Sequence, residues 1–376
     1  MAITPRFTFV GTPVIPKDKA KRPFYKEFEK VDNRTKKKRS MISMTFGVKE
    51  SDTNMAFVEA FDSVQDEILT MNSDNEKVSV AWEDRFDEDV ISSIANYRKY
   101  TCNLGEEYGG QVEFITAYDL MQHLNQYLKD YPGRIAVTGQ FTREWYAEKK
   151  IYTDRFRIQN VYAVTDTERK NRLGLVADVF YNKDSVDKSD FKENQKIYLN
   201  GYIEQYINKD EGTKMVPMQF VFSAAKYNMN NEQHKKLFDY KMSYIDVKNK
   251  KMVHIPWEMV LLRGAEEAEF NESMLTAKQK EQVELGLKTL EDFKPRGTIV
   301  GDKVNEYRLF DPRLMNGFED GLVELEDSMD EFEERIHVPV QDETLEEAKE
   351  KSKKSKAKEE DVPPFETEED DTEDLF

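Results

Sequence analysis

The chain has 376 residues, a formal net charge of −18 and a hydrophobic fraction of 38%. At about 100–200 residues per domain this length predicts two or three domains, and the aromatic fraction of 12% argues against a wholly disordered chain. One cysteine and four scattered histidines give no basis for a disulfide framework or a zinc cluster, so we expect neither disulfides, metals nor cofactors. Because the sequence also lacks a long apolar run, it predicts a cytoplasmic protein.

The negative charge is concentrated at the C-terminal end. Residues 318–376 contain 24 acidic and 7 basic side chains, which leaves 50 acidic and 49 basic side chains in residues 1–317. The body of the chain is therefore almost neutral, and the net charge does not argue against a nucleic-acid partner. Such an asymmetry is typical of an interaction tail.

Residues 1–112 are predicted to form a β-rich region, which could be a divergent OB-fold. Runs of β-branched and aromatic residues predict strands at 6–15, 40–48 and 55–61. A connecting helix is predicted within 113–133, because leucines recur there at helical spacing before the sequence YPG.

The segment 17–39 separates the first two predicted strands and carries 11 basic and 4 acidic side chains. We predict a long exposed loop whose cations could hold phosphates and whose rings could stack on bases. An ordinary solvated loop is the alternative. The candidate nucleic-acid ligands are Lys21, Arg22, Phe24, Tyr25, Lys36, Lys37, Lys38 and Arg39.

Residues 134–262 are predicted to form an OB-fold barrel with an extra hairpin. Five strand-like runs, with a longer polar link between the third and fourth, match the strand count and spacing of that barrel. The hairpin is predicted from the runs FDYKMSYIDV and KMVHIPWEMVLL. The five barrel strands are predicted at 134–146, 151–164, 173–181, 196–207 and 215–225.

The remaining residues are predicted to be helical and then disordered. Residues 263–340 form an acidic region in which Thr276 and Gln279 make a capping-box pair for a helix at 277–292. A short acidic amphipathic helix is predicted within 318–336. Residues 341–376 are dense in charge and are predicted to be a disordered acidic tail.

The second predicted barrel strand carries the strongest functional signal. If Phe156, Ile158 and Tyr162 point inward, alternation turns basic and amide side chains outward beside an aromatic and basic turn. Single-strand binders combine such cations with stacking rings. The alternative is that Trp145 and Tyr146 pack under the hairpin. The candidates are Arg143, Trp145, Tyr146, Lys149, Lys150, Tyr152, Arg155, Arg157 and Gln159.

Tyr198 and Tyr202 lie on the predicted strand 196–207, on the parity opposite to its aliphatic residues. An outward row of tyrosines could extend a stacking platform. It could equally cover the barrel beneath a helix, and the sequence leaves both interpretations open.

An OB-like barrel followed by a charged linker and an acidic terminus that ends in phenylalanine resembles the single-stranded DNA-binding proteins. The bacterial family ends in Pro-Phe after an acidic stretch, and some phage members end in Phe alone. This chain has DVPPF at 361–365 and EDDTEDLF at its end, which suggests a phage origin and a host cytoplasm. The resemblance implies that the tail competes with DNA for the barrel and recruits a polymerase, helicase or nuclease through Asp370, Asp371, Glu373, Asp374, Leu375 and Phe376.

The sequence therefore predicts a non-enzymatic protein that coats single-stranded DNA in replication, recombination or repair. Two alternatives stay open, an RNA-binding OB protein and an acidic inhibitory protein that mimics DNA. Competition between DNA and RNA distinguishes the first alternative. Failure to bind any nucleic acid, even after removal of the tail, distinguishes the second.

Overall fold

The computed structural model describes residues 4–17, 22–31, 38–248, 250–267, 275–294, 300–313 and 321–339. Contacts divide these residues into two compact units. One unit lies within residues 1–144 and 154–337, and the other comprises the hairpin tip Trp145–Thr153 with residues 338 and 339. The described chain is mainly β, which confirms the predicted fold class.

The first barrel is a ring of five described strands within residues 6–163. β1 pairs with β3 and β9, β3 pairs with β4, and β10 pairs with β9 and, in parallel, with β4. Helix α2 lies in the chain between the third and fourth strands of the ring. This closed Greek-key ring is the arrangement of an OB-fold. The elements are β1 (Arg6–Val14), β3 (Lys38–Lys49), β4 (Met55–Ser63), α2 (Ala117–Tyr127), β9 (Ile135–Tyr146) and β10 (Ile151–Ala163).

The second barrel repeats this order with five described strands within residues 172–312. β11 pairs with β13 and β15, β13 with β14, and β16 with β15 and, in parallel, with β14. Helix α4 again lies between the third and fourth strands. The elements are β11 (Arg172–Tyr181), β13 (Lys196–Asn208), β14 (Gly212–Ser223), α4 (Glu232–Ile245), β15 (Val253–Glu267) and β16 (Val300–Pro312).

The strand pairing corrects the predicted grouping of 134–225 into one barrel. The five predicted strands exist, but the first two close the N-terminal barrel and the last three open the C-terminal one. The reason lies in the core, where the rings of Phe141 and Phe156 pack against each other and Phe156 packs against Phe7 and Phe9 of β1, with centroids 4.8–5.4 Å apart. Alternation identifies a strand but not its partner.

Two further predictions in this part of the chain are wrong. Residues 238–245 are helical rather than a strand, because Asn231 caps α4 by accepting from the backbone N–H groups of Gln233 and His234. Residues 300–312, predicted as part of a helical region, form β16 and close the second barrel.

Alternating burial explains the strands of both barrels. On β3 the interior side chains of Ile42, Met44, Phe46 and Val48 are fully buried, while the residues between them, apart from Gly47, are partly exposed. The second barrel encloses Trp257 in the same way. This alternation fixes which side chains face outward, and it therefore defines the surfaces considered below.

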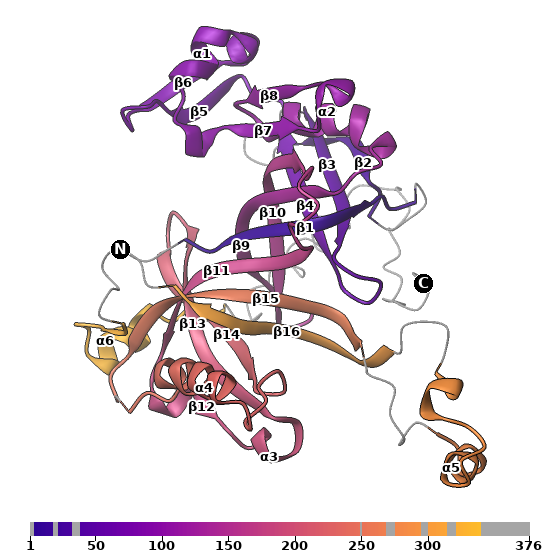
Figure 1. The fold of residues 1–376 in the computed structure, drawn as a ribbon. Coiled ribbons are helices and arrows are strands. Elements are labelled where there is room, and N and C mark those ends of the chain that lie inside the picture. Colours follow the sequence, from indigo (N-terminus) through magenta and orange to yellow (C-terminus); the bar gives the residue numbers. More distant parts are fainter. Residues whose placement is uncertain are drawn as a thin grey trace, which may run out of the picture. The chain divides into compact units, whose positions relative to one another are not determined.

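The barrels are joined through their first strands. β1 and β11 pair antiparallel from Arg6↔Val176 to Val10↔Arg172, and Figure 1 shows them side by side. The turn after β3 also contacts β15: the Asn54 side chain donates to the Leu261 carbonyl and accepts from the Arg263 backbone N–H, at 3.1 and 2.8 Å. A Cβ at Gly264 would lie 1.8 Å from the Thr53 carbonyl oxygen, so only glycine fits this contact.

Residues 64–116 are an insertion between the third strand of the first barrel and α2. Its small core contains Ile68, Ile94 and Ile115. The hairpin β7–β8 extends the barrel sheet, because β7 pairs in parallel with β10. The elements are β5 (Glu67–Met71), β6 (Lys77–Ala81), η1 (Trp82–Phe86), α1 (Glu88–Ser93), η2 (Asn96–Arg98), β7 (Tyr100–Asn103), η3 (Glu106–Tyr108) and β8 (Gln111–Phe114).

The connections of both barrels carry short elements. The predicted loop 17–39 contains the strand β2, paired with β3, which corrects the expectation of an irregular loop over its described part. The capping box of Thr276 and Gln279 is confirmed, although α5 ends earlier than predicted. The elements are β2 (Tyr25–Val31), η4 (Leu128–Asp130), η5 (Lys183–Ser185), β12 (Val186–Asp187), α3 (Phe191–Asn194), α5 (Ala277–Glu284), η7 (Leu290–Phe293), β17 (Val323–Glu324) and α6 (Met329–Arg335).

Candidate nucleic-acid interface

The outer surface of the first barrel presents two exposed phenylalanines among polar and basic side chains. Residues that pair across antiparallel strands point to the same side, and Lys26, Ser43 and Phe61 form one such row over β2, β3 and β4. Phe61 is 58% exposed and Phe57 is 39% exposed. We call this surface the open face, and it consists of Lys26, Phe28, Ser43, Thr45, Phe57, Glu59, Phe61, Arg155 and Arg157.

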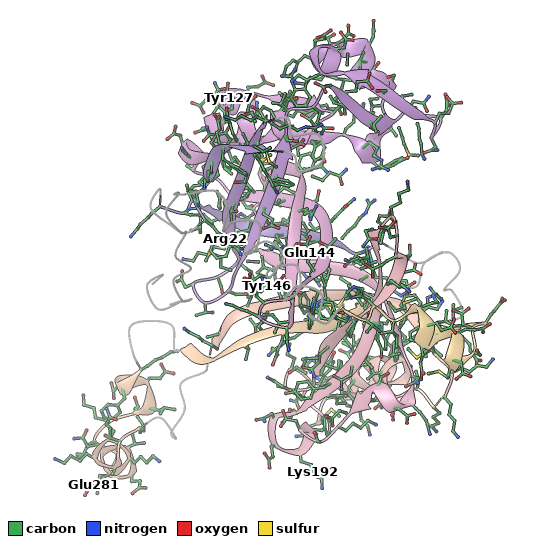
Figure 2. The ribbon with its side chains drawn as sticks, turned by 180° about the vertical axis from the view of Figure 1, so that it is seen from behind. Arg22, Tyr127, Glu144, Tyr146, Lys192 and Glu281 are labelled. Carbon is green, nitrogen blue, oxygen red and sulfur yellow. The ribbon has the colours of Figure 1, made fainter. Side chains whose placement is uncertain are left out.

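Two arginines of β10 complete the open face. Arg157 pairs in register with Glu59, and its guanidinium donates to Glu144 at 2.6 Å. Arg155 forms ion pairs with Glu59 and Glu144 at 3.2 and 3.4 Å. Glu144, on β9, is labelled in Figure 2. Arg157 and Glu144 are both exposed, and exposed ion pairs contribute only about 0–1 kcal/mol, so a phosphate can replace Glu144 as the partner of Arg157 at little cost. The Arg155 pair with Glu59 is half-buried.

The predicted ligand Gln159 has a structural contact instead. Its side-chain amide donates to the backbone carbonyls of Tyr97 and Lys99, at 2.8 and 3.2 Å, and so holds η2 against β10. The Tyr97 ring is 43% exposed, and the Arg98 guanidinium lies 5.4 Å from its centroid. The backbone of η2 therefore lies beside β10, whereas the Tyr97 side chain is directed toward the insertion, where its hydroxyl donates to Asn75 at 2.9 Å.

The prediction that Tyr162 of β10 points inward also needs correction. Phe156 and Ile158 are buried as expected, but Tyr162 is 37% exposed and Val161 is fully buried. The alternation shifts between these positions. Asn160 lies just before Val161, where the alternation changes. Its side chain donates to the Thr138 hydroxyl and accepts from the backbone N–H of Thr101.

The hairpin tip Trp145–Thr153 contains five of the predicted ligands. The rings of Trp145 and Tyr152 meet edge to face with centroids 5.1 Å apart, and Trp145 is half-buried. Tyr146 is 40% exposed and donates to Glu148. Lys149 is exposed, and Lys150 adopts a left-handed backbone conformation with a φ of 52° at the turn. The tip thus presents cations and one exposed ring, while Trp145 packs within it.

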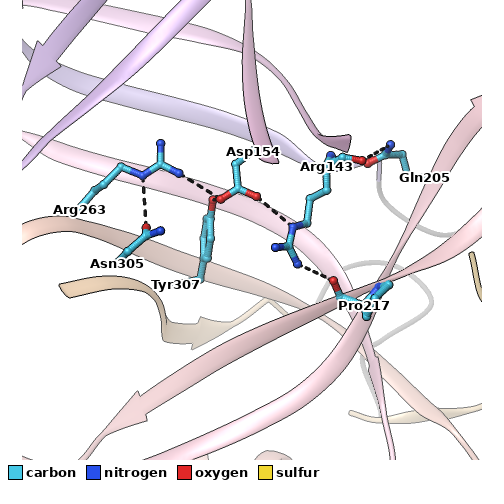
Figure 3. A network of polar contacts seen from close by, with 7 residues as sticks. All are labelled: Arg143, Asp154, Gln205, Pro217, Arg263, Asn305 and Tyr307. Atoms are coloured by element: carbon cyan, nitrogen blue, oxygen red, sulfur yellow. Dashed lines mark hydrogen bonds and ion pairs between the residues drawn. The ribbon is translucent and has the colours of Figure 1, made fainter. Parts of the chain in front are cut away.

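Arg143 belongs to a polar network where the two barrels meet (Figure 3). Asp154 accepts from Arg143 at 2.9 Å, from Arg263 at 3.1 Å and from the Tyr307 hydroxyl at 2.6 Å. Burial, and next the Asp154 carboxylate, raise the pKa of Tyr307 well above its usual value, so this hydroxyl stays protonated and donates. The geometry gives Arg143 a structural role in joining the barrels.

Helix α6 covers part of the outer surface of the second barrel. Tyr202 lies beneath α6, edge to face with Phe332 at 5.4 Å, and Arg335 pairs with Glu204 at 2.7 Å. Of the two interpretations left open by the sequence, Tyr202 therefore follows the helix-covered one. Tyr198 is half-buried and its hydroxyl donates to Asp190 at 3.1 Å.

The basic segment between β1 and β3 is only partly described. Phe24 is 1% exposed and packs against Phe46, so its ring belongs to the core rather than to a stacking surface. Arg22 and Lys38 are exposed, Tyr25 donates to Glu27, and Arg39 is half-buried. The predicted ligands outside the described residues are Lys21, Lys36, Lys37, Asp370, Asp371, Glu373, Asp374, Leu375 and Phe376.

Sequence reasoning missed Phe57 and Phe61 of the open face, and it also missed Tyr97 and Arg98 of the insertion. A signal for the first two was present in MAFVEAF, where the phenylalanines share a parity with Glu59 and oppose the small residues Ala56 and Ala60. Tyr97 and Arg98 carried no such signal, because the placement of η2 depends on the fold of the insertion.

Other kinds of site have little support among the described residues. Within the described ranges, no group of three or more His, Cys, Asp or Glu side chains could hold a metal ion. Burial raises the pKa of the Cys102 thiol to about 12, which suppresses the reactive thiolate. No helix among the described residues has the length and apolar character needed to cross a membrane.

Of the comparisons with known proteins, the one with solved structures gave a match. No family model matches the chain, and no curated protein matches it. The crystal structure of wild-type single-stranded DNA binding protein from Thermus aquaticus aligns with 73% of this chain and 99% of its own, at 6% sequence identity and a TM-score of 0.28.

Proposed function

We propose that this protein binds single-stranded DNA during replication, recombination or repair, without catalysing a reaction. The observation that carries the proposal is the open face, where Phe57 and Phe61 stand exposed beside Arg155 and Arg157. It spans the second and third strands of a five-strand barrel, which is the surface that OB-folds use for oligonucleotides.

The proposed mechanism combines stacking with charge neutralisation. Unpaired bases stack on the exposed rings, each for about 1–3 kcal/mol, and the sugar–phosphate backbone follows the arginines. A phosphate that binds Arg157 replaces Glu144 as its partner, and Glu144 keeps its ion pair with Arg155. Affinity should therefore fall steeply with salt, because phosphate contacts release counterions.

The C-terminal residues have a second role in this proposal. Ten carboxylates follow Lys358 without an intervening base, so the tail resembles a short polyanion. It competes with DNA for basic side chains and, once displaced, recruits replication or recombination proteins through Leu375 and Phe376. This part rests on the sequence alone.

Fluorescence anisotropy tests the proposal. The full chain and a chain truncated after Val340 are titrated into a labelled dT oligonucleotide at several salt concentrations, with unlabelled RNA of equal length as competitor. We expect binding that weakens with salt, tighter binding by the truncated chain, and poor competition by RNA. Absence of binding by both chains would contradict the proposal and favour a DNA-mimic protein, whereas stronger competition by RNA would favour an RNA-binding protein.

A further inference from the structure

A pocket of 320 Å³ opens on the second barrel beside the junction. β14 and β16 provide most of its wall, β13 adds Tyr198, and Arg143 and Asp154 reach it from the first barrel. Its volume lies at the lower end of the range of about 300–1,000 Å³ for small-ligand pockets. A single nucleoside suits this size better than a longer segment.

The charged groups of the pocket are paired within the protein. Asp154 is 8% exposed and holds Arg143, Arg263 and Tyr307, as described above. Glu306 pairs with Lys196 and with Arg308, at 2.6 and 2.7 Å. Because two carboxylates line the pocket and their cations are already engaged, a phosphate group is a poor match for it.

Two neutral amides in the pocket, unlike its charged groups, keep unused hydrogen-bonding atoms. The side-chain nitrogen of Gln219 donates to Asn200 at 2.9 Å, and the side-chain oxygen of Asn305 accepts from Arg263 at 3.2 Å, as Figure 3 shows for the latter. These bonds fix both amides. Both residues are exposed, and in the described part of the chain the Gln219 oxygen and the Asn305 nitrogen have no protein partner, so one acceptor and one set of donors stay available to a ligand.

Fixed amides with free donors and acceptors match the edge of a nucleobase, which displays such groups side by side. Tyr198 supplies an aromatic ring at the same pocket, held by its bond to Asp190. We propose that this pocket takes one unpaired base of the bound strand and reads its edge through Gln219 and Asn305. The inference rests on the proposed function and deepens it, because it adds a base-dependent subsite to a surface that otherwise binds by stacking.

The test compares homopolymers on the full chain. Labelled dA, dC and dT oligonucleotides of equal length are titrated into the wild type, the double variant Gln219→Ala/Asn305→Ala, and Asn230→Ala, an exposed amide outside the pocket. One well-placed pair of bonds gives about 5- to 150-fold discrimination between bases. We expect wild-type affinities to differ within this range, the double variant to reduce the differences to about twofold, and Asn230→Ala to retain them.

A second variant guards against loss of folding. Asn305→Asp preserves the shape of the side chain but replaces the amide donors with a charge, and thermal denaturation shows whether each variant folds. Equal wild-type affinities for the three homopolymers, or an unchanged pattern in the folded variants, would overturn the base-reading pocket while leaving DNA binding intact. Failure of the wild type to bind any of them would overturn the proposed function as well.

Discussion

The two barrels share a strand order but differ in what covers their outer faces. In the first barrel, Phe57 and Phe61 stand exposed on β4. In the second, α6 lies over Tyr202, and Phe332 is 1% exposed within a cluster that includes Phe180, Met215 and Met252. The first barrel thus leaves two phenylalanine rings of one strand exposed, whereas the chain's own helix covers Tyr202 on the second barrel. The second barrel also has an exposed phenylalanine, Phe310 on β16, but the cations of Arg172 and Lys241 lie over its ring.

This difference shows that function resides in the outward side chains rather than in the fold. Both barrels bury alternate side chains along their strands, and these buried side chains form the barrel cores. The outward positions differ between the barrels: one set carries the phenylalanines and arginines that we propose to bind nucleic acid, and the other anchors a helix. The predictions below test this contrast, from the largest expected effect to the smallest.

Phe332→Ala should reduce the free energy of unfolding by about 3–5 kcal/mol, as for other buried phenylalanines, because it leaves a cavity beneath α6. Thermal denaturation measures the loss, and the exposed Glu333→Ala serves as a control on the same helix. DNA affinity should stay within about twofold of the wild type. A marked gain in affinity would show that the covered face also binds DNA, and the contrast between the barrels would fail.

Asp154→Asn should reduce the free energy of unfolding by about 3 kcal/mol, the low end for breaking a buried ion pair, since Arg143 and Arg263 keep some solvent contact. The substitution retains the shape of the side chain but removes the charge that holds both arginines. Chemical denaturation at neutral pH measures the effect. The exposed Asp74→Asn controls for a change in net charge. An unchanged midpoint would mean that the network does not join the barrels.

Phe61→Ala should weaken binding of a dT oligonucleotide by about 5- to 150-fold, which corresponds to the loss of one stacked base. The matched control is Tyr206→Ala, an aromatic side chain on the second barrel that is 62% exposed. Anisotropy titrations of both variants at one salt concentration give the comparison. Equal losses for the two variants would remove the distinction between the faces.

Arg157→Gln should lower the salt slope of binding by about 0.7, the value for one phosphate contact on a single strand. Lys214→Gln should leave the slope unchanged because Lys214 lies on β14 of the second barrel, outside the open face. Titrations between low and moderate salt give both slopes. A slope that does not change for Arg157→Gln would exclude this guanidinium from phosphate binding.

The sequence predicted most strands but misplaced the barrel boundaries. Alternation along β9 and β10 was visible, yet β1, the partner of β9, lies about 130 residues earlier in the chain, and no local pattern encodes that pairing. The helix α4 was missed for a related reason. Its aromatic residues have high strand propensity, and the cap at Asn231 together with packing of Phe238 on Phe222 overrides it.

The candidate site was predicted in part. The alternation placed Arg155 and Arg157 outward correctly, because Phe156 and Ile158 are indeed buried. The sequence did not show that Arg143, unlike Arg155 and Arg157, has a structural role, because its partner Asp154 is one of many acidic residues. The role of the tail residues stays a prediction.

The pairing of β1 with both β9 and β11 has a consequence for how the chain folds. β1 is synthesised before β9 and β11, so residues as far along as Val176 must exist before both of its edges can be paired. Contacts this distant in sequence slow folding, because the loop must close before any contact forms. During synthesis β1 therefore keeps unpaired edges until β9 and β11 have been made. Its pairing with both strands couples the folding of the two barrels.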